Sequence, residues 1–285
     1  MAQIGWQELC DLVKDDDGLP VRDVGVWSED KLYFWHRYVQ ITTTAMVGKS
    51  TWSSINYIDL FSGPGVCRVE VTGKRLPGSP LIAAYATKPF SKIIACELDP
   101  VLASACRKRL DNSPAKEQVV VFEGDCNLHV NEIVQLIPKR SLTLAFIDPE
   151  ALHVQFNTVK QIASCGAVDL LILVADAFDI SRNVDEYYFN NQQSKLDYFL
   201  GHDSNWRNDW GKLDNRTSEN VHNLFYEVYK RQLNSIGYTS FGEQRISGPS
   251  GPLYRLVYAS KNDRGLDFWN KAKKRDRKGQ DSLFN

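Results

Sequence analysis

The sequence predicts an α/β fold: a mostly parallel β-sheet with helices on both faces and an antiparallel hairpin near its C-terminal end. The first observation is that short apolar runs alternate with segments of helical spacing, which is typical of parallel sheets. A second is that these runs are followed by small or acidic residues. The third is that the last two apolar runs are joined by a short link rich in glycine and proline, which favours an antiparallel pair.

The first apolar run carries the clearest signal for a ligand site. Residues 55–61 read as a strand buried on both faces, and Ser62-Gly63-Pro64-Gly65 follows directly. Glycines in such a turn let the backbone approach a ligand without a Cβ in the way. Because α/β folds bind nucleotides at the carboxyl edge of the sheet, we expect a binding crevice beside this turn.

The other elements follow in order along the chain. A helix is expected from Ser28 as its N-cap, with Lys31, His36 and Arg37 on its wetter side. Further helices follow the strands and carry apolar residues at i, i+3, i+4 and i+7. The expected later strands span residues 92–96, 119–122, 142–147, 169–174, 238–246 and 253–260.

A basic hairpin is predicted between the glycine turn and the next helix. Residues 66–77 read as this hairpin, a flap inserted close to whatever binds at the turn. Its basic residues are Arg68, Lys74 and Arg75. Ser79 fits as the N-cap of the following helix, whose free backbone N–H groups favour an anionic ligand group.

The chain divides into a single large domain with appendages. We expect an N-terminal extension at 1–30, one domain at 31–274 and a basic tail at 275–285. Within the domain, residues 175–216 form a long excursion, rich in aromatics and without clean periodicity. We expect it to cover the functional site as a lid rather than to form core.

Composition excludes several classes of protein. The net charge of −1 provides no global attraction to nucleic acid or membrane, so any polyanion must bind at a local patch. Six cysteines occur singly, which argues against a disulfide framework or a zinc knuckle and fits a reducing compartment. Neither a membrane span nor a signal peptide is evident. The expectation is a soluble, cytoplasmic protein.

Acidic residues end four successive predicted strands, at Asp59, Glu97, Asp125 and Asp148. Because parallel strands end at one edge of a sheet, these carboxylates converge on one crevice. Each has a distinct task if the ligand is S-adenosylmethionine. Glu97 accepts both ribose hydroxyls, Asp125 takes the adenine amino group, and Asp148 lies beside the methyl group to be moved.

These motifs resemble those of class I methyltransferases: D-L-F-S-G-P-G at 59–65, then Glu97, Gly124-Asp125 and Asp148-Pro149. More narrowly, F-S-G-P-G, G-S-P-L at 78–81, I-D-P at 147–149 and the segment 253–262 resemble the three-Cys-motif partner (TcmP) family. That resemblance implies a Rossmann-like methyltransferase fold, S-adenosylmethionine as cofactor and a protein with a three-cysteine motif as partner.

The resemblance and the strand-end pattern together give the predicted site. The catalytic residues are Asp148, Pro149 and Glu150. The predicted cofactor-binding residues are Asp59, Phe61, Gly63, Gly65, Ser79, Glu97, Asp99 and Asp125. No metal is assigned, although Asp148 and Glu150, with Asp176 and Asp179, leave metal-assisted O-methylation open.

The loop Asp148-Pro149-Glu150-Ala151 departs from amino-methyltransferases, which carry Pro-Pro-aromatic after the polar residue. Its missing base-stacking ring is expected from Phe178, Tyr187 or Tyr188. Cytosine C5 methylation is excluded because it needs a Pro-Cys nucleophile, and none occurs.

Two alternatives to an active methyltransferase are weighed. A dinucleotide-binding protein needs G-x-G-x-x-G after its first strand, whereas Gly63-Pro64-Gly65 continues differently. The other is an inactive protein of methyltransferase fold that binds cofactor or a partner protein. For an active enzyme we expect a nitrogen or oxygen acceptor, in a nucleic acid held by Arg68, Lys74, Arg75 and the basic tail.

Overall fold

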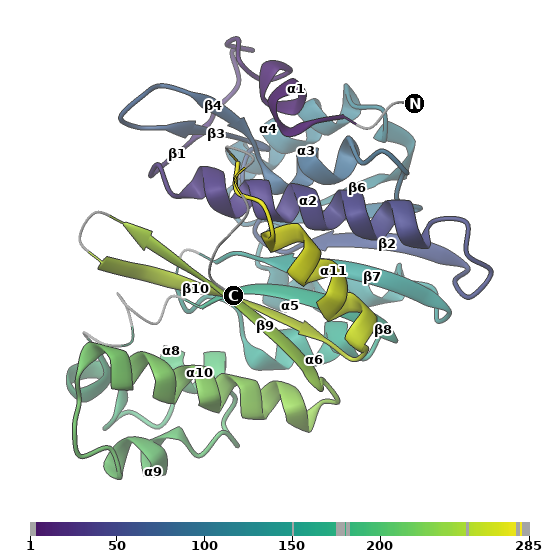
Figure 1. The fold of residues 1–285 in the computed structure, drawn as a ribbon. Coiled ribbons are helices and arrows are strands. Elements are labelled where there is room, and N and C mark those ends of the chain that lie inside the picture. The colour runs from purple at the N-terminus through teal and green to yellow at the C-terminus, as the bar shows by residue number, and fades with distance from the viewer. Residues whose placement is uncertain are drawn as a thin grey trace.

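The computed structural model describes residues 4–149, 151–174, 180, 183–248, 251–277 and 280. Its main sheet has seven strands in the order β6-β5-β2-β7-β8-β10-β9 (Figure 1). The strands are β2 (Ser54–Asp59), β5 (Lys92–Glu97), β6 (Val119–Glu123), β7 (Ser141–Ile147), β8 (Ala167–Val174), β9 (Ser240–Gly248) and β10 (Gly251–Ser260).

The pairing of these strands confirms the predicted fold class. The neighbouring strands β6, β5, β2, β7 and β8 pair in parallel, and β10 runs antiparallel to both β8 and β9. This is a Rossmann-like arrangement, with its antiparallel hairpin at the C-terminal end. The sequence predicted it because the apolar strands alternate with helices until the two final strands follow one another directly.

Helices cover both faces of the sheet (Figure 1). They are α1 (Trp6–Asp11), α2 (Ser28–Met46), α3 (Ser79–Ala84), α4 (Pro100–Asp111), α5 (Cys126–Gln135), α6 (Phe156–Ala163), α8 (Lys195–Leu200), α9 (Trp206–Gly211), α10 (Ser218–Ser235) and α11 (Asp263–Lys273), with the short helical turns η1 (Lys116–Gln118) and η3 (Val184–Tyr188).

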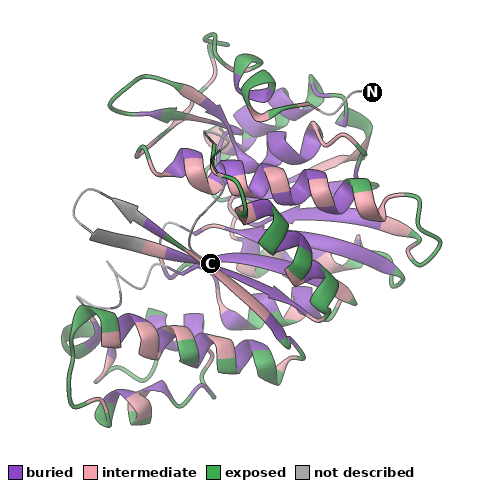
Figure 2. Cartoon of the chain, in the orientation of Figure 1, coloured by how far each residue is buried: buried purple, intermediate pink, exposed green. Residues whose placement is uncertain are grey.

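Alternate residues of each strand point to opposite faces, so the sheet separates two hydrophobic cores. Tyr57 of β2 packs in the core formed with α2, α3, α4 and α11, whereas Ile58 packs in the core formed with α5, α6, α8 and α10. The central strands are buried along nearly their whole length (Figure 2). This rigid sheet fixes the positions of the turns that follow its strands.

The flap predicted at 66–77 is a hairpin of β3 (Val66–Val69) and β4 (Arg75–Pro77). A third strand joins it: β1 (Arg22–Val24), from the N-terminal segment, pairs in parallel with β3. The small sheet lies beside the first turn of α2 (Figure 1). Residues of the N-terminal extension therefore lie next to the glycine turn, which the sequence did not predict.

The excursion at 175–216 differs from its expected role as a lid. In its described part, Trp206 and Trp210 of α9 are each 2% exposed and Phe199 of α8 is fully buried. These rings pack in the same core as Phe225 of α10. The described part of the segment therefore belongs to a helical layer on one face of the sheet. Its helices are short, so their apolar spacing does not stand out in the longer windows of sequence in which helices are recognised.

Two helix starts differ from the prediction by one residue. Helix α2 begins at Ser28, with Trp27 in the N-cap position, and α3 begins at Ser79, with Gly78 in that position. The expectation that Lys31 and His36 lie on the wetter side of α2 was wrong: His36 is 4% exposed and the Lys31 side chain 12%. His36 is covered by Trp6 of α1, whose ring centre lies 5.7 Å from that of the imidazole, and Lys31 by its contacts with Asp148 and Tyr254.

Candidate functional site

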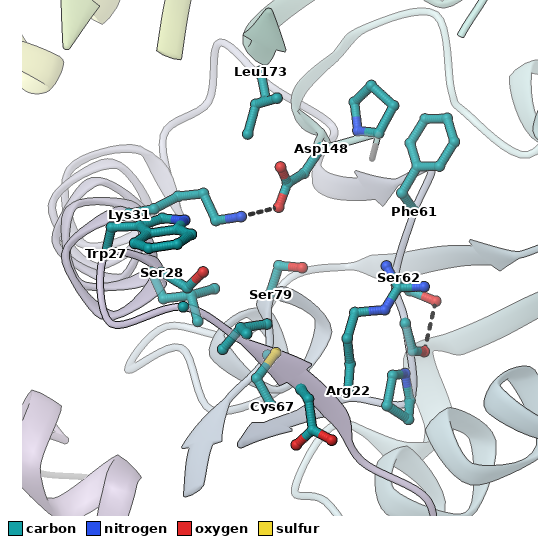
Figure 3. A pocket seen from close by; sticks show the side chains of 18 of the residues that line it. Arg22, Trp27, Ser28, Lys31, Phe61, Ser62, Cys67, Ser79, Asp148 and Leu173 are labelled. Carbon is teal, nitrogen blue, oxygen red and sulfur yellow. Dashed lines mark hydrogen bonds and ion pairs between the residues drawn. The ribbon is translucent and has the colours of Figure 1, made fainter. Parts of the chain in front are cut away.

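A pocket of about 390 Å³ lies where β2 and β7 end, against the first turn of α2 (Figure 3). Of the predicted site residues, the pocket is lined by Phe61, Gly63, Ser79, Asp148 and Pro149. Its other lining residues come from β1 and the turn after it, α2, the glycine turn, the flap, the N-cap of α3 and strands β8 and β10: Arg22, Asp23, Val24, Gly25, Trp27, Ser28, Lys31, Leu32, Ser62, Pro64, Cys67, Gly78, Leu173 and Tyr254.

The glycine turn presents one open backbone position to this pocket. Gly63 has φ +58°, and a Cβ built there would have one neighbour within 4 Å, Arg22 Nε at 3.9 Å. Gly65 has φ +84° but lies away from the pocket lining, where its carbonyl accepts a 2.8 Å hydrogen bond from the Gly78 N–H. Gly63 thus gives a ligand close access to backbone, and Gly65 fixes the turn against α3.

Asp59 supports the turn from beneath and does not line the pocket. It is fully buried and accepts hydrogen bonds from the Tyr57 hydroxyl at 3.0 Å and the Phe61 N–H at 3.3 Å. Burial raises the pKa of Asp59 to about 7. Hydrogen bonds from the Ser79 and Tyr57 hydroxyls favour the ionised form and partly oppose this increase. Asp59 is therefore a structural residue of the turn, and the Ser79 hydroxyl binds it instead of capping α3.

Glu97, at the end of β5, contacts the glycine turn directly. Its carboxylate accepts the Gly63 N–H at 2.8 Å and the Asp99 N–H at 3.0 Å, and the residue is 6% exposed. A carboxylate offers about four lone-pair positions, so two remain for a ligand. This geometry suits a residue that holds the turn in place and also accepts hydrogen bonds from sugar hydroxyls.

Asp99 and Asp125 act as helix caps outside the pocket lining. Asp99 accepts the N–H groups of the first turn of α4 at 2.7 and 3.1 Å, and Asp125 accepts the Asn127 N–H in α5 at 2.8 Å. Their loops lie together, because the Gly124 N–H donates to the Glu97 carbonyl at 2.9 Å. Leu98, which follows Glu97, and Leu128 of α5 are 67% and 76% exposed, so both present large apolar surfaces.

An ion pair crosses the pocket between Lys31 of α2 and Asp148 after β7 (Figure 3). The two side chains are only 12% and 19% exposed. Burial alone would lower the pKa of Lys31, but the Asp148 carboxylate and the nearby Tyr254 hold it above its usual range. Lys31 Nζ also lies 5.7 Å from the centre of the Tyr254 ring. Glu150, the third predicted catalytic residue, lies outside the described residues.

Sequence reasoning missed Lys31, Arg22, Trp27 and Tyr254 as pocket residues. One signal was available for Lys31, because a cation in the first turns of a helix opposes the helix dipole and calls for a compensating partner. Arg22, Trp27 and Tyr254 carry no comparable signal. Of the expected stacking rings that the structure describes, Tyr188 is buried in the core and Tyr187 is exposed, and neither lines the pocket. Phe178 lies outside the described residues.

Four of the cations predicted to grip phosphate are engaged with carboxylates: Arg68, Lys74, Arg75 and Arg277. On the flap, each of the three predicted basic side chains has an acidic partner, and Arg277 of the tail contacts two acidic residues of α2. The pairs are Arg68–Asp23 at 2.7 Å, Lys74–Glu29 at 2.6 Å, Arg75–Asp16 at 3.0 Å, Arg75–Asp17 at 2.8 Å, Arg277–Glu29 and Arg277–Asp30 at 2.8 Å. These pairs reduce the positive charge that the flap presents to a polyanion.

A second cavity, of about 450 Å³, lies at the opposite edge of the sheet. It is lined by the buried Asp169, which accepts a 2.7 Å hydrogen bond from the Tyr38 hydroxyl. None of the strand-end residues identified from the sequence lines it. The pocket at Asp148 is therefore the candidate active site, because it lies at the carboxyl ends of the parallel strands, where α/β folds bind their ligands.

In the described part of the chain, no group of three or more His, Cys, Asp and Glu side chains is placed to hold a metal ion. Glu150, Asp176 and Asp179 of the metal alternative lie outside the described residues. No helix among the described residues has the length and apolar character needed to cross a membrane.

No protein-family model matches the chain, and no curated protein matches its sequence. Among solved structures it is similar to protein LPL1258 from Legionella pneumophila, with 14% identity, a TM-score of 0.49 and coverage of 88% of this chain and 94% of that one. It is also similar to an O-methyltransferase from Bacillus cereus in complex with S-adenosylhomocysteine, with 12% identity, a TM-score of 0.47 and coverages of 90% and 96%.

A third similar structure is the O-methyltransferase TomG from Streptomyces achromogenes in complex with S-adenosylmethionine. Its identity to this chain is 10%, its TM-score 0.45, and the coverages are 92% and 100%. Because these TM-scores lie below 0.5, the strand order of the sheet, rather than any one neighbour, is the basis for the fold class.

Proposed function

We propose that this protein is an S-adenosylmethionine-dependent methyltransferase that acts on a nitrogen or oxygen acceptor. The observation that carries the proposal is that the open face of Gly63 and the Asp148 carboxylate line one pocket, at the carboxyl edge of a sheet with the methyltransferase strand order. The proposal extends to the three-Cys-motif partner family, whose motifs the sequence resembles.

The residues around the turn fit the three parts of the cofactor. The remaining acceptor positions of Glu97 suit the two ribose hydroxyls, and the exposed Leu98 and Leu128 offer apolar faces for the adenine. The space in front of Gly63, beside Arg22, suits the amino-acid end, whose carboxylate an arginine recognises well. When bound, S-adenosylmethionine supplies a methyl group on a positively charged sulfur, which keeps the electron pair of the broken bond.

Asp148 has the chemistry needed on the acceptor side. Its carboxylate is held by the Lys31 ammonium and is placed to accept a hydrogen bond, and then the proton, from an incoming N–H or O–H group. Because methyl transfer requires aligned donor and acceptor more than strong acid catalysis, the fixed position of Asp148 matters more than its basicity.

Cofactor binding is tested by calorimetry on the purified protein with S-adenosylhomocysteine, S-adenosylmethionine and NAD. We expect heat with the two sulfur ligands and none with NAD. Glu97→Ala should weaken binding at least about 100-fold, since two hydrogen bonds to a charged acceptor contribute roughly 1.5–3 kcal/mol each. Glu123→Ala is the matched control, because Glu123 occupies the same register on the neighbouring strand but is exposed.

An inactive cofactor-binding protein is the second candidate. It is favoured by the Lys31–Asp148 pair itself, which occupies part of the carboxylate that an acceptor needs. Methyl transfer to any acceptor would exclude this candidate, and Asp148→Ala then tests the role assigned to Asp148. In an enzyme, turnover is lost and cofactor affinity stays within about twofold. Unchanged turnover would assign the chemistry to other residues.

A nucleic-acid acceptor and a three-cysteine-motif partner stay predictions from the sequence. The ion pairs on the flap weaken the electrostatic case for the first. Salt dependence of binding to single-stranded RNA or DNA tests it, because each phosphate contact contributes a slope of about −0.7 to −0.9. No binding at low salt would direct the search to protein or small-molecule acceptors.

A further inference from the structure

The buried ion pair at the pocket has unused hydrogen-bonding capacity. Of the three N–H groups of Lys31, one faces Asp148, and the carboxylate of Asp148 keeps acceptor positions beyond the one that Lys31 occupies. Both side chains line the pocket and are only slightly exposed. The pocket therefore presents a hydrogen-bond acceptor and a hydrogen-bond donor side by side.

Such a pair is complementary to a ligand edge that carries a donor and an acceptor on neighbouring atoms. An amino group attached next to a ring nitrogen has this pattern: its N–H points to Asp148 while the ring nitrogen accepts from Lys31. A single hydroxyl would engage both side chains through one atom and leave its ring free to rotate. The two-point contact instead fixes the plane of the ring.

Aromatic rings beside the pair provide flat walls for a planar group. Trp27 precedes Lys31 by one helical turn, and its ring folds over Gly25, where an added Cβ would meet the indole at 2.3 Å. Tyr254 also lines the pocket, with its ring centre 5.7 Å from the Lys31 ammonium. Nucleic-acid-binding proteins stack planar bases on rings of this kind.

Charge and volume narrow the acceptor further. The Lys31 ammonium repels a protonated alkylamine, so a lysine-like acceptor is disfavoured at Asp148. The pocket volume, about 390 Å³, is at the small end of the range for ligand sites and is shared with the amino-acid end of the cofactor. The space that is left suits one small ring.

From these features we infer that the methyl acceptor is a planar heterocycle with an exocyclic amino group next to a ring nitrogen, read by Asp148 and Lys31 and stacked on Trp27 or Tyr254. The inference rests on the proposed methyltransferase function and specifies its substrate class. In the reaction, the amino nitrogen bonds to the methyl carbon as the methyl–sulfur bond breaks. Its displaced proton passes to Asp148, and the electron pair stays on the sulfur of S-adenosylhomocysteine.

Ligand-observed NMR titrations of the protein saturated with S-adenosylhomocysteine test the inference without knowledge of the natural acceptor. The probes are four six-membered rings. 2-Aminopyrimidine carries both the amino group and an adjacent ring nitrogen, pyrimidine carries only ring nitrogens, aniline carries only the amino group, and phenol carries a hydroxyl group. We expect 2-aminopyrimidine to bind at least tenfold more tightly than the other three. Lys31→Met and Asp148→Asn should each remove most of this preference.

Matched controls separate recognition from damage to the fold. Lys49→Met removes an exposed lysine at the opposite edge of the sheet, and Glu123→Gln changes an exposed carboxylate; both should keep the tenfold preference. Circular dichroism and S-adenosylhomocysteine affinity are measured for every variant. If one pocket variant fails to fold, the other still tests the recognition.

Two results would overturn the inference while leaving cofactor binding intact. One is equal affinity for pyrimidine and 2-aminopyrimidine in protein that binds S-adenosylhomocysteine. Another is tighter binding of phenol, which would make the acceptor a hydroxyl group. Failure of S-adenosylhomocysteine to bind at all would instead overturn the proposed function, and the inference with it.

Discussion

Lys31 and Asp148 form an ion pair across the candidate active site, although 117 positions separate them in the sequence. The pair connects the first turn of α2 to the loop after β7, so it joins the helix that precedes the glycine turn to the strand end expected to carry catalysis. Neither residue is exposed by more than 19% of its side chain. The pair is therefore both a structural link and the source of the local charge pattern.

Removal of Lys31 should leave Asp148 as a poorly solvated carboxylate without its partner. We expect Lys31→Met to lower the free energy of unfolding at pH 7 by about 1–3 kcal/mol, measured by urea denaturation. The double variant Lys31→Met/Asp148→Asn should recover part of this loss because no charge remains buried. An equal loss in Lys49→Met would show that the effect is general to lysine removal.

Asp59 should make stability depend on pH. Its pKa rises from 3.8 in the unfolded chain to about 7 in the folded protein, because burial disfavours the charge. Between these values the folded state binds the proton and the unfolded state does not. The stabilisation from protonated Asp59 is therefore complete below about pH 4, declines as pH rises towards 7, and is absent above it.

The measurement compares wild type with Asp59→Asn, which mimics the neutral carboxyl. We expect the wild type to lose stability relative to the variant by up to about 4 kcal/mol between pH 4 and pH 7, at about 1.4 kcal/mol per pH unit. Above pH 7 the difference should level off. Parallel stability curves for the two proteins across this range would contradict the raised pKa.

Gly63 and Gly73 give a matched pair of glycine substitutions. Both have left-handed φ angles, +58° and +69°, so alanine at either position should cost about 1–2 kcal/mol of stability. Only at Gly63 does the new methyl group project into the pocket. We expect Gly63→Ala to weaken S-adenosylhomocysteine binding at least tenfold by calorimetry, and Gly73→Ala to leave it unchanged. Equal affinities would move the cofactor away from this turn.

Arg109 ties the N-terminal segment to the glycine turn. Its guanidinium donates to the Pro64 carbonyl at 2.6 Å, the Pro20 carbonyl at 2.8 Å and the Asp17 carboxylate at 2.7 Å, and its side chain is 5% exposed. Lysine at position 109 should not restore these contacts, because a single ammonium group cannot reproduce the planar set of donors of a guanidinium.

For Arg109→Lys we expect about 1–3 kcal/mol lower stability and faster proteolysis near Asp17 at a stability-matched urea concentration. Arg107→Lys is the control, since Arg107 makes one 2.9 Å hydrogen bond to the Val121 carbonyl. Unchanged cleavage in Arg109→Lys would show that other contacts hold the N-terminal segment.

The sequence by itself determined the order and type of the main elements. Buried strands have to be continuous apolar runs, and their ends have to be turns, so residues 55–61 and the glycines after them were readable locally. The same holds for the closing hairpin and for the edge at which Asp59, Glu97, Asp125 and Asp148 gather. These features depend on the periodicity of apolar residues and on the alternation of strands with helices, which implies parallel strands. Both patterns can be recognised in short windows of sequence.

Only the tertiary structure decided what those carboxylates contact. It placed Asp59 beneath the turn, Asp99 and Asp125 on helix ends, and Asp148 against Lys31. It also brought Arg22 into the pocket on a strand that pairs with the flap. The physical reason is that such contacts join segments far apart in sequence. Their partners are set by the path of the chain and the packing around it, which no local pattern of residues records.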